Sequence, residues 1–291
     1  MSNKDKWLTI LVCFVLLILC AGGGAFRKKE VKTGISAAAE LKGKALGGVE
    51  GRMPGNSAKI FFESMLGVKL SGYNAYKNMD EALYALRTGK AAAIWAADVT
   101  VDYLQKWNPD CYPLDTSGTA SIMELPEGRF DFGLAAKNDK KGKELVESLN
   151  TAIGAMKKDG MLAALTEQYI YRDENSDKFT EKDMANKSKK NVLRVGITGA
   201  VQPVELIDTN GKPYGFCVAF MDEIGQRLER KVEFVVLDNE TIFTSLMSGR
   251  IDAVFCYGTP GKITTEGTLK WVTTDGYLQC RGYKLLSIKD E

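Results

Sequence analysis

The sequence predicts an α/β fold with two lobes. After an apolar N-terminal stretch, β-rich apolar runs alternate with segments of helical periodicity, which indicates layers of strands and helices. One arrangement occurs twice: Leu86-Arg-Thr-Gly89 leads into the run AAAIW, and Leu246-Met-Ser-Gly249 leads into IDAVF. Helix–glycine–strand connections are common in α/β proteins, but here the flanking order of elements repeats as well. We therefore expect two related lobes.

The first half of the chain is predicted to contain three strands separated by helices. Alternating or continuous apolar runs indicate strands, and apolar residues three or four positions apart indicate helices. Asn78 or Asp80 is expected to cap a helix that stops at Gly89. Asp98 is expected to begin a further helix as its N-cap. The other predicted elements are strands at 45–49, 68–73 and 91–96 and a helix at 57–66.

The second half begins with helices and returns to strands. A long helix is predicted around 143–158, where apolar residues form one stripe and Gly160 follows the last turn. A shorter helix follows it. Residues 172–191 are nearly all polar and lack periodicity, so they are predicted to be an exposed linker. Later elements are strands at 192–197 and 231–237, a helix ending at Leu228, and a helix–strand pair within 245–255.

The N-terminus has the pattern of a secretory signal. Residues 7–20 are apolar except for one threonine, and two lysines precede them. Three outcomes remain open. Cys20 is a lipidation candidate; cleavage after Ala25 would release a soluble protein; and an uncleaved segment at 7–26 is long enough to cross a bilayer. All three predict export, with the chain in the periplasm or at the cell surface, and the first and third attach it to the membrane.

Composition excludes several classes of function. The formal net charge of +2 gives no basic field, so no nucleic-acid partner is expected. The absence of histidine removes Ser-His-Asp and Cys-His catalysis and most zinc sites. The six cysteines lack metal-ligand spacing, so no metal or other cofactor is expected. Cys256 and Cys280 are candidates for a disulfide, but burial as small apolar residues is the favoured interpretation.

Several segments, taken in series, resemble one protein family. VLRVGI at 192–197, the turn at 208–212, Gly215-Phe216, KVEFVVL and SLMSGRIDAVF resemble, in this order, the first lobe of the extracytoplasmic solute-binding proteins of amino-acid-type ABC importers. ELKGKALGGVE at 40–50 and RFDFGLAAKND at 129–139 resemble the second half of that family. The resemblance implies a type II periplasmic-binding-protein-like fold of the family 3 kind.

The two halves of the family pattern occur in reversed order. This order predicts a circularly permuted binding protein; a fragment of a tandem protein and a domain-swapped dimer are the alternatives. A permuted chain places residues near Ile288 beside residues near Ile35. The predicted organisation is a signal or anchor at 1–26, a linker at 27–35, lobe two at 36–128, a return strand and helices packing on lobe one at 129–171, a polar linker at 172–191 and lobe one at 192–291.

Ligand-binding residues are expected beyond the carboxyl ends of strands and beside helix N-termini. Four segments meet this condition: Thr198–Val204, Cys256–Thr259, Gly51–Ser57 and Trp95–Asp98. When the strand ends of one lobe face those of the other, they form a cleft that closes by hinge motion.

In lobe one the family's binding pattern is partly present. The resemblance implies a hydroxyl contact from Thr259, and Tyr257 offers a stacking face. Pro203 lies in the expected ligand loop, but Val204 stands where the family has an aromatic residue. The segment CYGTPGKITTEG lacks the arginine with which the family clamps a ligand carboxylate.

In lobe two Arg52 is a candidate for the missing cation, because a guanidinium binds a carboxylate bidentately; the alternative is a solvated loop arginine. Asp98 resembles the family's carboxylate for a ligand ammonium, although it stands one residue late. Trp95 is either a stacking surface or a core residue. Asn56 and Ser57 either donate to an anion or cap a helix.

The favoured function is a non-enzymatic protein that captures a small polar solute, an amino acid or a related molecule, and delivers it to an ABC permease. A ligand sensor or scaffold with a degenerate cleft is the alternative, because the family's arginine and aromatic positions are lost. A dehydratase-like enzyme acting through Asp98 or Glu205 is the third hypothesis.

Overall fold

The computed structural model describes residues 34–49, 55–117, 131–172, 179–185, 191–259 and 270–289. All of them belong to one compact unit, Thr33–Glu291. The predicted signal or anchor at 1–26, with Cys20, lies outside the described residues, and so does Arg52. Within the described ranges, none of the helices combines the length and the hydrophobicity that a membrane crossing requires.

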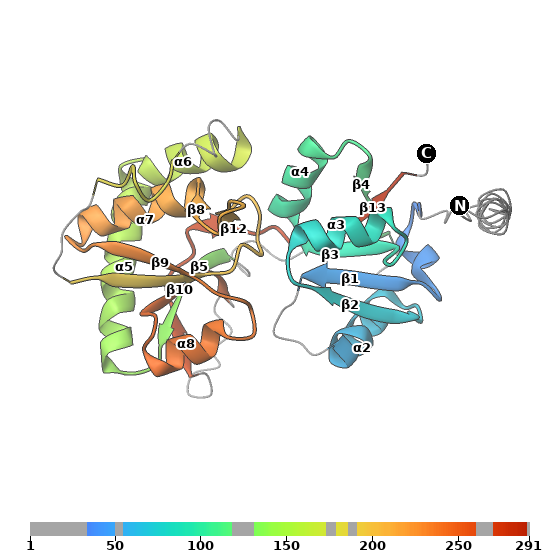
Figure 1. The fold of residues 1–291 in the computed structure, drawn as a ribbon, viewed down its shortest axis with the longest axis horizontal. Coiled ribbons are helices and arrows are strands. Elements are labelled where there is room, and N and C mark those ends of the chain that lie inside the picture. Colours follow the sequence, from blue (N-terminus) through green and yellow to red (C-terminus); the bar gives the residue numbers. More distant parts are fainter. Residues whose placement is uncertain are drawn as a thin grey trace, which may run out of the picture. The chain divides into compact units, whose positions relative to one another are not determined.

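The first sheet has the strand order β2-β1-β3-β13-β4 (Figure 1). β1 (Ala45–Val49) lies parallel to β2 (Gly72–Tyr76) and to β3 (Ala93–Ala97). β13 (Tyr283–Ile288) lies antiparallel between β3 and β4 (Cys111–Pro113). This sheet therefore joins strands from the first half of the chain with one from its last ten residues.

The second sheet has the strand order β11-β5-β10-β6-β9, with β12 also paired to β5. β6 lies parallel to β9 and β10, whereas β5 runs antiparallel to β10. Its strands are β5 (Asp131–Lys137), β6 (Leu193–Ile197), β9 (Val232–Val236), β10 (Ala253–Thr259), β11 (Trp271–Thr273) and β12 (Leu278–Gln279). A separate hairpin pairs β7 (Leu206–Ile207) with β8 (Pro213–Tyr214).

The two sheets have the same internal order. Each contains three parallel strands followed by an antiparallel strand that comes from the other half of the chain, β13 in the first sheet and β5 in the second. The predicted two-lobed α/β fold is thereby confirmed. The segment expected as lobe one, 192–291, contributes its last strand to the other sheet.

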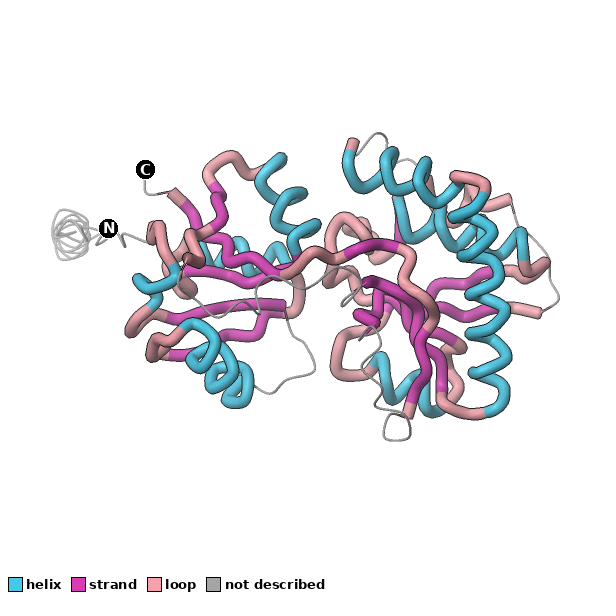
Figure 2. The backbone as a smooth tube through the Cα atoms, turned by 180° about the vertical axis from the view of Figure 1, so that it is seen from behind, coloured by secondary structure: helices cyan, strands magenta, loops and turns pink. Residues whose placement is uncertain are grey.

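Helices flank both sheets, and local signals set their ends (Figure 2). Asn78 Oδ1 accepts a hydrogen bond from the backbone N of Glu81 at 2.9 Å, and Asp139 Oδ1 accepts one from Gly142 N at 2.9 Å. Gly249 ends α8 with a left-handed φ of 77°. The helical segments are η1 (Ala38–Leu41), α2 (Gly55–Leu66), α3 (Met79–Arg87), α4 (Asp98–Trp107), α5 (Lys140–Lys158), α6 (Met161–Thr166), the π-helical turn η3 (Glu167–Tyr171), α7 (Phe216–Arg227) and α8 (Ile242–Ser248).

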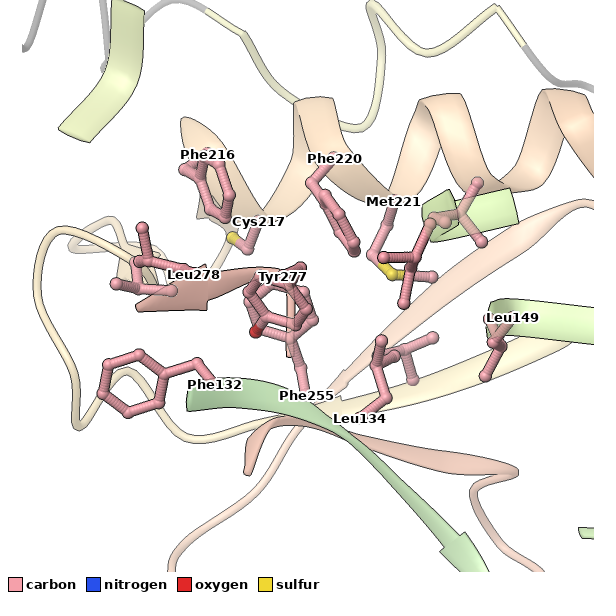
Figure 3. Close-up of a cluster of buried hydrophobic side chains, with 14 of the residues drawn as sticks. Phe132, Leu134, Leu149, Phe216, Cys217, Phe220, Met221, Phe255, Tyr277 and Leu278 are labelled. Carbon is pink, nitrogen blue, oxygen red and sulfur yellow. The ribbon is translucent and has the colours of Figure 1, made fainter. Parts of the chain in front are cut away.

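The core between α7 and the second sheet is rich in aromatic side chains (Figure 3). The ring centroid of Tyr277 lies 4.5 Å from that of Phe220 and 5.3 Å from that of Phe255. Phe216 stacks on Phe220 at 5.7 Å. All four side chains are buried. Because aromatic pairs add about 0.5–1.5 kcal/mol beyond their burial, this cluster holds α7 firmly on the sheet.

The strand predicted at 68–73 is wrong, because the strand lies at Gly72–Tyr76. Leu70 belongs to a loop instead. Its backbone N donates a hydrogen bond to Glu63 Oε1 at 2.9 Å, and its side chain is buried in the core. The alternation of Val68 and Leu70 therefore reflects a loop that packs beneath α2, not a pleated strand.

The described part of the predicted exposed linker, 179–185, is largely exposed but contacts the second sheet's core through one buried side chain. Met184 is 4% exposed and belongs to the hydrophobic core of the second sheet. The backbone N of Gly215 donates to Phe179 O at 2.9 Å, and Thr180 forms a β-bridge with Tyr214. The polar composition of 172–191 therefore gave no indication that Met184 is buried in the core.

Residues near Ile35 and residues near Ile288 lie beside the same strand, β4. Ile288 pairs with β4 in the sheet, and Tyr112 Oη donates a hydrogen bond to Ile35 O. The backbone N of Leu114 donates to Leu285 O at 2.8 Å, and the side chains of Ile35 and Leu285 share one apolar cluster. The end of β13 and the segment around Ile35 therefore both contact β4.

Candidate functional site

A cavity of about 140 Å³ lies where several strands end and helices begin. From the first sheet and its helices, the ends of β1 and β3, the start of β13 and the first turns of α3 and α4 line this cavity. On the other side, the start of β5 and the loop after β6 line it. Open α/β sheets bind ligands at the carboxyl ends of their parallel strands. Among the described residues, those that line it are Val49, Met79, Trp95, Ala96, Ala97, Thr100, Phe132, Ala200, Val201 and Tyr283.

Trp95 forms an aromatic wall of this cavity. Its indole Nε1 donates to Tyr73 Oη at 2.8 Å, and its ring centroid lies 4.7 Å from Tyr283 and 4.8 Å from Phe62. Burial raises the pKa of Tyr73, and the bond from Trp95 opposes that rise. Gly48 leaves room for the indole, because a Cβ at this position would lie 2.4 Å from Trp95 Nε1. Trp95 is therefore both a packed residue and a cavity surface.

Asp98 lies beside the crossover into β13 and does not line the cavity. Its backbone N donates to Gly282 O at 3.0 Å, and its Oδ2 accepts from the backbone N of Arg281 at 3.2 Å. The residue is 9% exposed. The expected N-cap role is wrong, because Ala97 is the N-cap and Asp98 is the first helical residue. One oxygen of its carboxylate thus binds the chain itself, whereas the other, Oδ1, is buried with no hydrogen-bond partner among the described residues.

A second hollow, of about 560 Å³, adjoins the same crossover. Its charged lining residues are Asp98, Asp102, Arg281 and Lys284. Lys284 Nζ lies 2.6 Å from Asp102 Oδ1 in an exposed ion pair. Such exposed pairs contribute at most about 1 kcal/mol. Because the described lining holds two acidic and two basic side chains, it shows no preference for a ligand of one charge.

A buried carboxylate holds the loop after β6. Thr198 Oγ1 donates to Glu205 Oε2 at 2.9 Å, and Ala200 N donates to Thr198 Oγ1 at 3.2 Å. The backbone N of Glu205 donates to Val201 O at 2.8 Å. Burial raises the pKa of Glu205 to about 7, and the bond from Thr198 opposes that rise. Because Ala200 and Val201 line the cavity, Glu205 positions this part of its wall.

The described cysteines are free thiols, so the disulfide considered between Cys256 and Cys280 is not formed. Cys217 and Cys280 are buried, and burial raises the pKa of each to about 12. Cys256 lies at an irregularity of β10 with a φ of 51°, and its backbone N donates to Tyr277 Oη at 3.1 Å. Among the described residues, no cluster of acidic or cysteine side chains is arranged to hold a metal ion.

The remaining predicted ligand residues lie apart from the cavity or have no described side chain. Asn56 and Ser57 are exposed on α2. Pro203 is buried in the loop after β6 and does not line the cavity. Tyr257 and Thr259 lie on β10 opposite β5, with side chains outside the described part of the chain. Trp95 alone, among the predicted residues with described side chains, lines the cavity.

Sequence reasoning missed most of the lining. Met79, Thr100, Phe132 and Tyr283 each lie within the first three residues of a helix or strand. Position at an element's end is the signal that marks them, but apolar residues at such positions are usually core residues. Glu205 was considered only as a catalytic group, although its place between two apolar neighbours indicates burial.

The stretch from β6 to β10 carries a family signal. Residues 193–260 match the bacterial extracellular solute-binding proteins, family 3. This match confirms the resemblance that runs from VLRVGI to IDAVF. The matched segment provides three neighbouring strands of the second sheet and the loop with Ala200 and Val201. A comparison of the sequence with curated proteins gives no match.

Several solved structures are similar to this chain. The arginine 3rd transport system periplasmic binding protein of Legionella pneumophila is 12% identical over 86% of this chain and 87% of that one, with a TM-score of 0.41. The amino acid ABC transporter substrate-binding protein AbpA of Streptococcus pneumoniae, bound to L-arginine, is 14% identical over 87% and 83%, with a TM-score of 0.40. An ancestral arginine-binding protein bound to arginine is 14% identical over 86% of each chain, with a TM-score of 0.39. Sequence identities and TM-scores this low do not indicate which ligand this chain binds.

Proposed function

We propose that this chain is an extracytoplasmic solute-binding protein that delivers a small solute to an ABC permease. The observation that carries the proposal is the cavity at the carboxyl ends of β1 and β3, completed by the loop after β6 and the start of β5. The family match at 193–260 supports the same function.

The mechanism is closure around the ligand. Trp95 and Tyr283 come from the first sheet, whereas Phe132 and Val201 come from strands and loops of the second. A ligand that contacts both sets stabilises the conformation in which they lie together, and so shifts the population toward a closed form. The permease then receives the ligand from that form.

Binding without chemistry fits the described lining better than catalysis does. Its polar side-chain groups are the hydroxyls of Thr100 and Tyr283 and the indole N–H of Trp95, and none of these groups exchanges protons readily near neutral pH. A dehydratase-like reaction requires a carboxylate that faces the ligand. Neither candidate is among the described lining residues: Oδ2 of Asp98 accepts from Arg281 N while its Oδ1 is buried without a partner among the described residues, and Glu205 is buried against Thr198.

A ligand sensor or scaffold is the second candidate function. The observation that favours it is that none of the described lining residues is charged. An amino acid brings an ammonium and a carboxylate, and each needs a partner when it leaves water. Both candidate functions use the same cavity. They differ in the partner that recognises the closed form, which is an ABC permease in the first case and another protein in the second.

We also infer that the lobes are joined in permuted order. Each sheet receives its antiparallel strand from the other half of the chain, and residues near Ile35 and Ile288 share β4 as a neighbour. In this interpretation the segment 172–191 joins the ends of an unpermuted ancestor. The apolar segment 7–20 supports a signal or an anchor that keeps the protein on the extracytoplasmic side.

A ligand-dependent thermal shift tests the proposed function. The full chain is heated with amino acids, organic acids, small peptides and uncharged aromatic or aliphatic solutes. A saturable rise in Tm with one class supports the binding function, because a ligand that binds only the folded state stabilises it. Absence of a shift across the whole panel contradicts solute binding, and turnover of a ligand would instead establish an enzyme.

A further inference from the structure

The hollow of about 560 Å³ at the crossover into β13 lies at the edge of the first sheet. β4 pairs with β13 from Leu286 to Ile288, whereas Asp115, two residues after β4, bonds to the backbone of Ser36 instead. The start of β13 therefore borders the hollow. Its volume is within the range of about 300–1,000 Å³ that is typical of small-molecule sites. Tyr283 belongs to this lining and to that of the cavity beside Trp95, so the two spaces adjoin.

Asp98 brings a buried carboxylate oxygen to this hollow. The residue is 9% exposed and belongs to the lining; its Oδ2 accepts the bond from Arg281 N, but its Oδ1 has no hydrogen-bond partner among the described residues. The nearby thiol of Cys280 donates to Gly282 O at 3.3 Å, and burial, followed by the Asp98 carboxylate, raises its pKa to about 12, so this thiol supplies no positive charge. A buried acceptor without a donor costs free energy. A cationic donor that enters from the hollow removes that cost.

Arg281 brings a cation to the same hollow. Its backbone is held by the bond to Asp98, whereas its side chain is exposed and forms no ion pair with any described residue. The other two charged groups of the lining neutralise each other, because Lys284 Nζ lies 2.6 Å from Asp102 Oδ1. A guanidinium binds a carboxylate through two parallel hydrogen bonds. The described lining thus holds one unpaired group of each sign on residues that are bonded to each other.

We propose that this hollow binds the charged end of a small zwitterion, with Asp98 Oδ1 accepting its ammonium and the guanidinium of Arg281 binding its carboxylate. The proposal rests on the solute-binding function and adds a charged subsite to it, from which the rest of the solute extends toward Trp95. Arg281 belongs to the crossover and not to the segment after Thr259, where the resemblance implies an arginine. Both charges of the solute are then bound at the crossover.

Calorimetric titration of the full chain tests the two charge contacts separately. Thermal shifts with the common L-amino acids first select the amino acid that raises Tm most. This amino acid is then titrated beside its amide, which lacks the carboxylate, and its N-acetyl derivative, which lacks the ammonium. The free amino acid is expected to bind saturably and each derivative at least tenfold more weakly, because each leaves one charged side chain of the hollow without its partner.

Two variants assign the contacts to residues. Arg281→Gln is expected to weaken binding of the free amino acid at least tenfold and to leave that of the amide within twofold. Asp98→Asn keeps an acceptor for Arg281 N, and is expected to weaken the free amino acid at least tenfold while leaving the N-acetyl derivative within twofold. Arg250→Gln and Asp275→Asn remove the same charges from exposed residues outside both linings, and should leave all affinities within twofold. Tm values establish which variants fold.

Each outcome decides a separate claim. Affinity for the free amino acid that is unchanged in folded Arg281→Gln and Asp98→Asn overturns the assignment to this hollow, while the solute-binding function stands. An Arg281→Gln variant that weakens the amide as much as the free amino acid overturns the carboxylate contact. If none of the amino acids binds, the charged subsite is overturned. The solute-binding function then stands if another class of the wider solute panel raises Tm, and falls if none does.

Discussion

The carboxylate of Asp98 accepts a hydrogen bond at 3.2 Å from the backbone N of Arg281, a residue 183 positions later in the chain. The backbone N of Asp98 donates in return to Gly282 O at 3.0 Å. These two bonds attach the first turn of α4 to the crossover into β13. A residue whose charge and position indicated a ligand contact thus fixes the strand that links the two sheets.

Asp98→Ala is expected to lower the free energy of unfolding by about 1–3 kcal/mol, because it removes the acceptor of the partly buried hydrogen bond from Arg281 N. Asp98→Asn keeps an acceptor oxygen and should lose less. Urea unfolding followed by circular dichroism measures both. Asp102→Ala is the matched control, since its ion pair with Lys284 is exposed and contributes at most about 1 kcal/mol. Equal losses in Asp98→Ala and Asp102→Ala would refute the structural role of Asp98.

Gly48→Ala is expected to displace Trp95 and so to deform the cavity. The added Cβ would lie 2.4 Å from Trp95 Nε1 and 2.5 Å from Tyr73 Oη, and overpacking of this kind costs about 1–3 kcal/mol. The variant should show altered tryptophan fluorescence, lower stability and weaker ligand binding. Gly72→Ala is the control on the neighbouring strand, where a Cβ meets no atom within 4 Å. Unchanged fluorescence in Gly48→Ala would contradict the packing described for Trp95.

Glu205 is expected to make the stability of the protein depend on pH. Its pKa is about 7 in the folded state against 4.5 for the ordinary side chain, so the unfolded chain releases this proton first as the pH rises. The free energy of unfolding should therefore fall between about pH 4.5 and 7, by up to about 3 kcal/mol, and then level off.

Glu205→Gln stays uncharged and still accepts the hydrogen bond from Thr198, so it should lack this contribution. Denaturant unfolding at several pH values measures the difference between the wild type and the variant. A difference that is constant from pH 4.5 to 7 would show that Glu205 is not the group responsible.

Met184→Ala is expected to destabilise the fold although the residue lies in a polar stretch. Its side chain is 4% exposed in the core of the second sheet, and replacing a buried methionine with alanine typically costs about 2–5 kcal/mol. Lys182→Ala changes an exposed neighbour and should stay within about 0.5 kcal/mol of the wild type. Thermal unfolding distinguishes the two. Similar Tm values for both variants would mean that 179–185 is a loose linker after all.

The sequence predicts those elements whose signals are local. The cap at Asn78, the glycine stop at Gly249 and the apolar run of β6 each depend on a few neighbouring residues, and the structure places them as expected. The cavity depends on where distant strand ends meet, and its walls at Met79 and Phe132 have the same chemistry as a core. The N-cap predicted at Asp98 was wrong for a related reason: its carboxylate accepts from the backbone N of Arg281, 183 positions later, which no local side-chain pattern indicates.

The central claim is that the cavity beside Trp95 is a solute site. The most direct measurement is a fluorescence titration of a chain in which Trp95 is the sole tryptophan, with Trp7, Trp107 and Trp271 replaced by phenylalanine. The account predicts a saturable change in Trp95 emission with at least one small solute, and loss of that change when Ala200→Leu is added. A panel of solutes that leaves the emission of the folded single-tryptophan chain unchanged would contradict it.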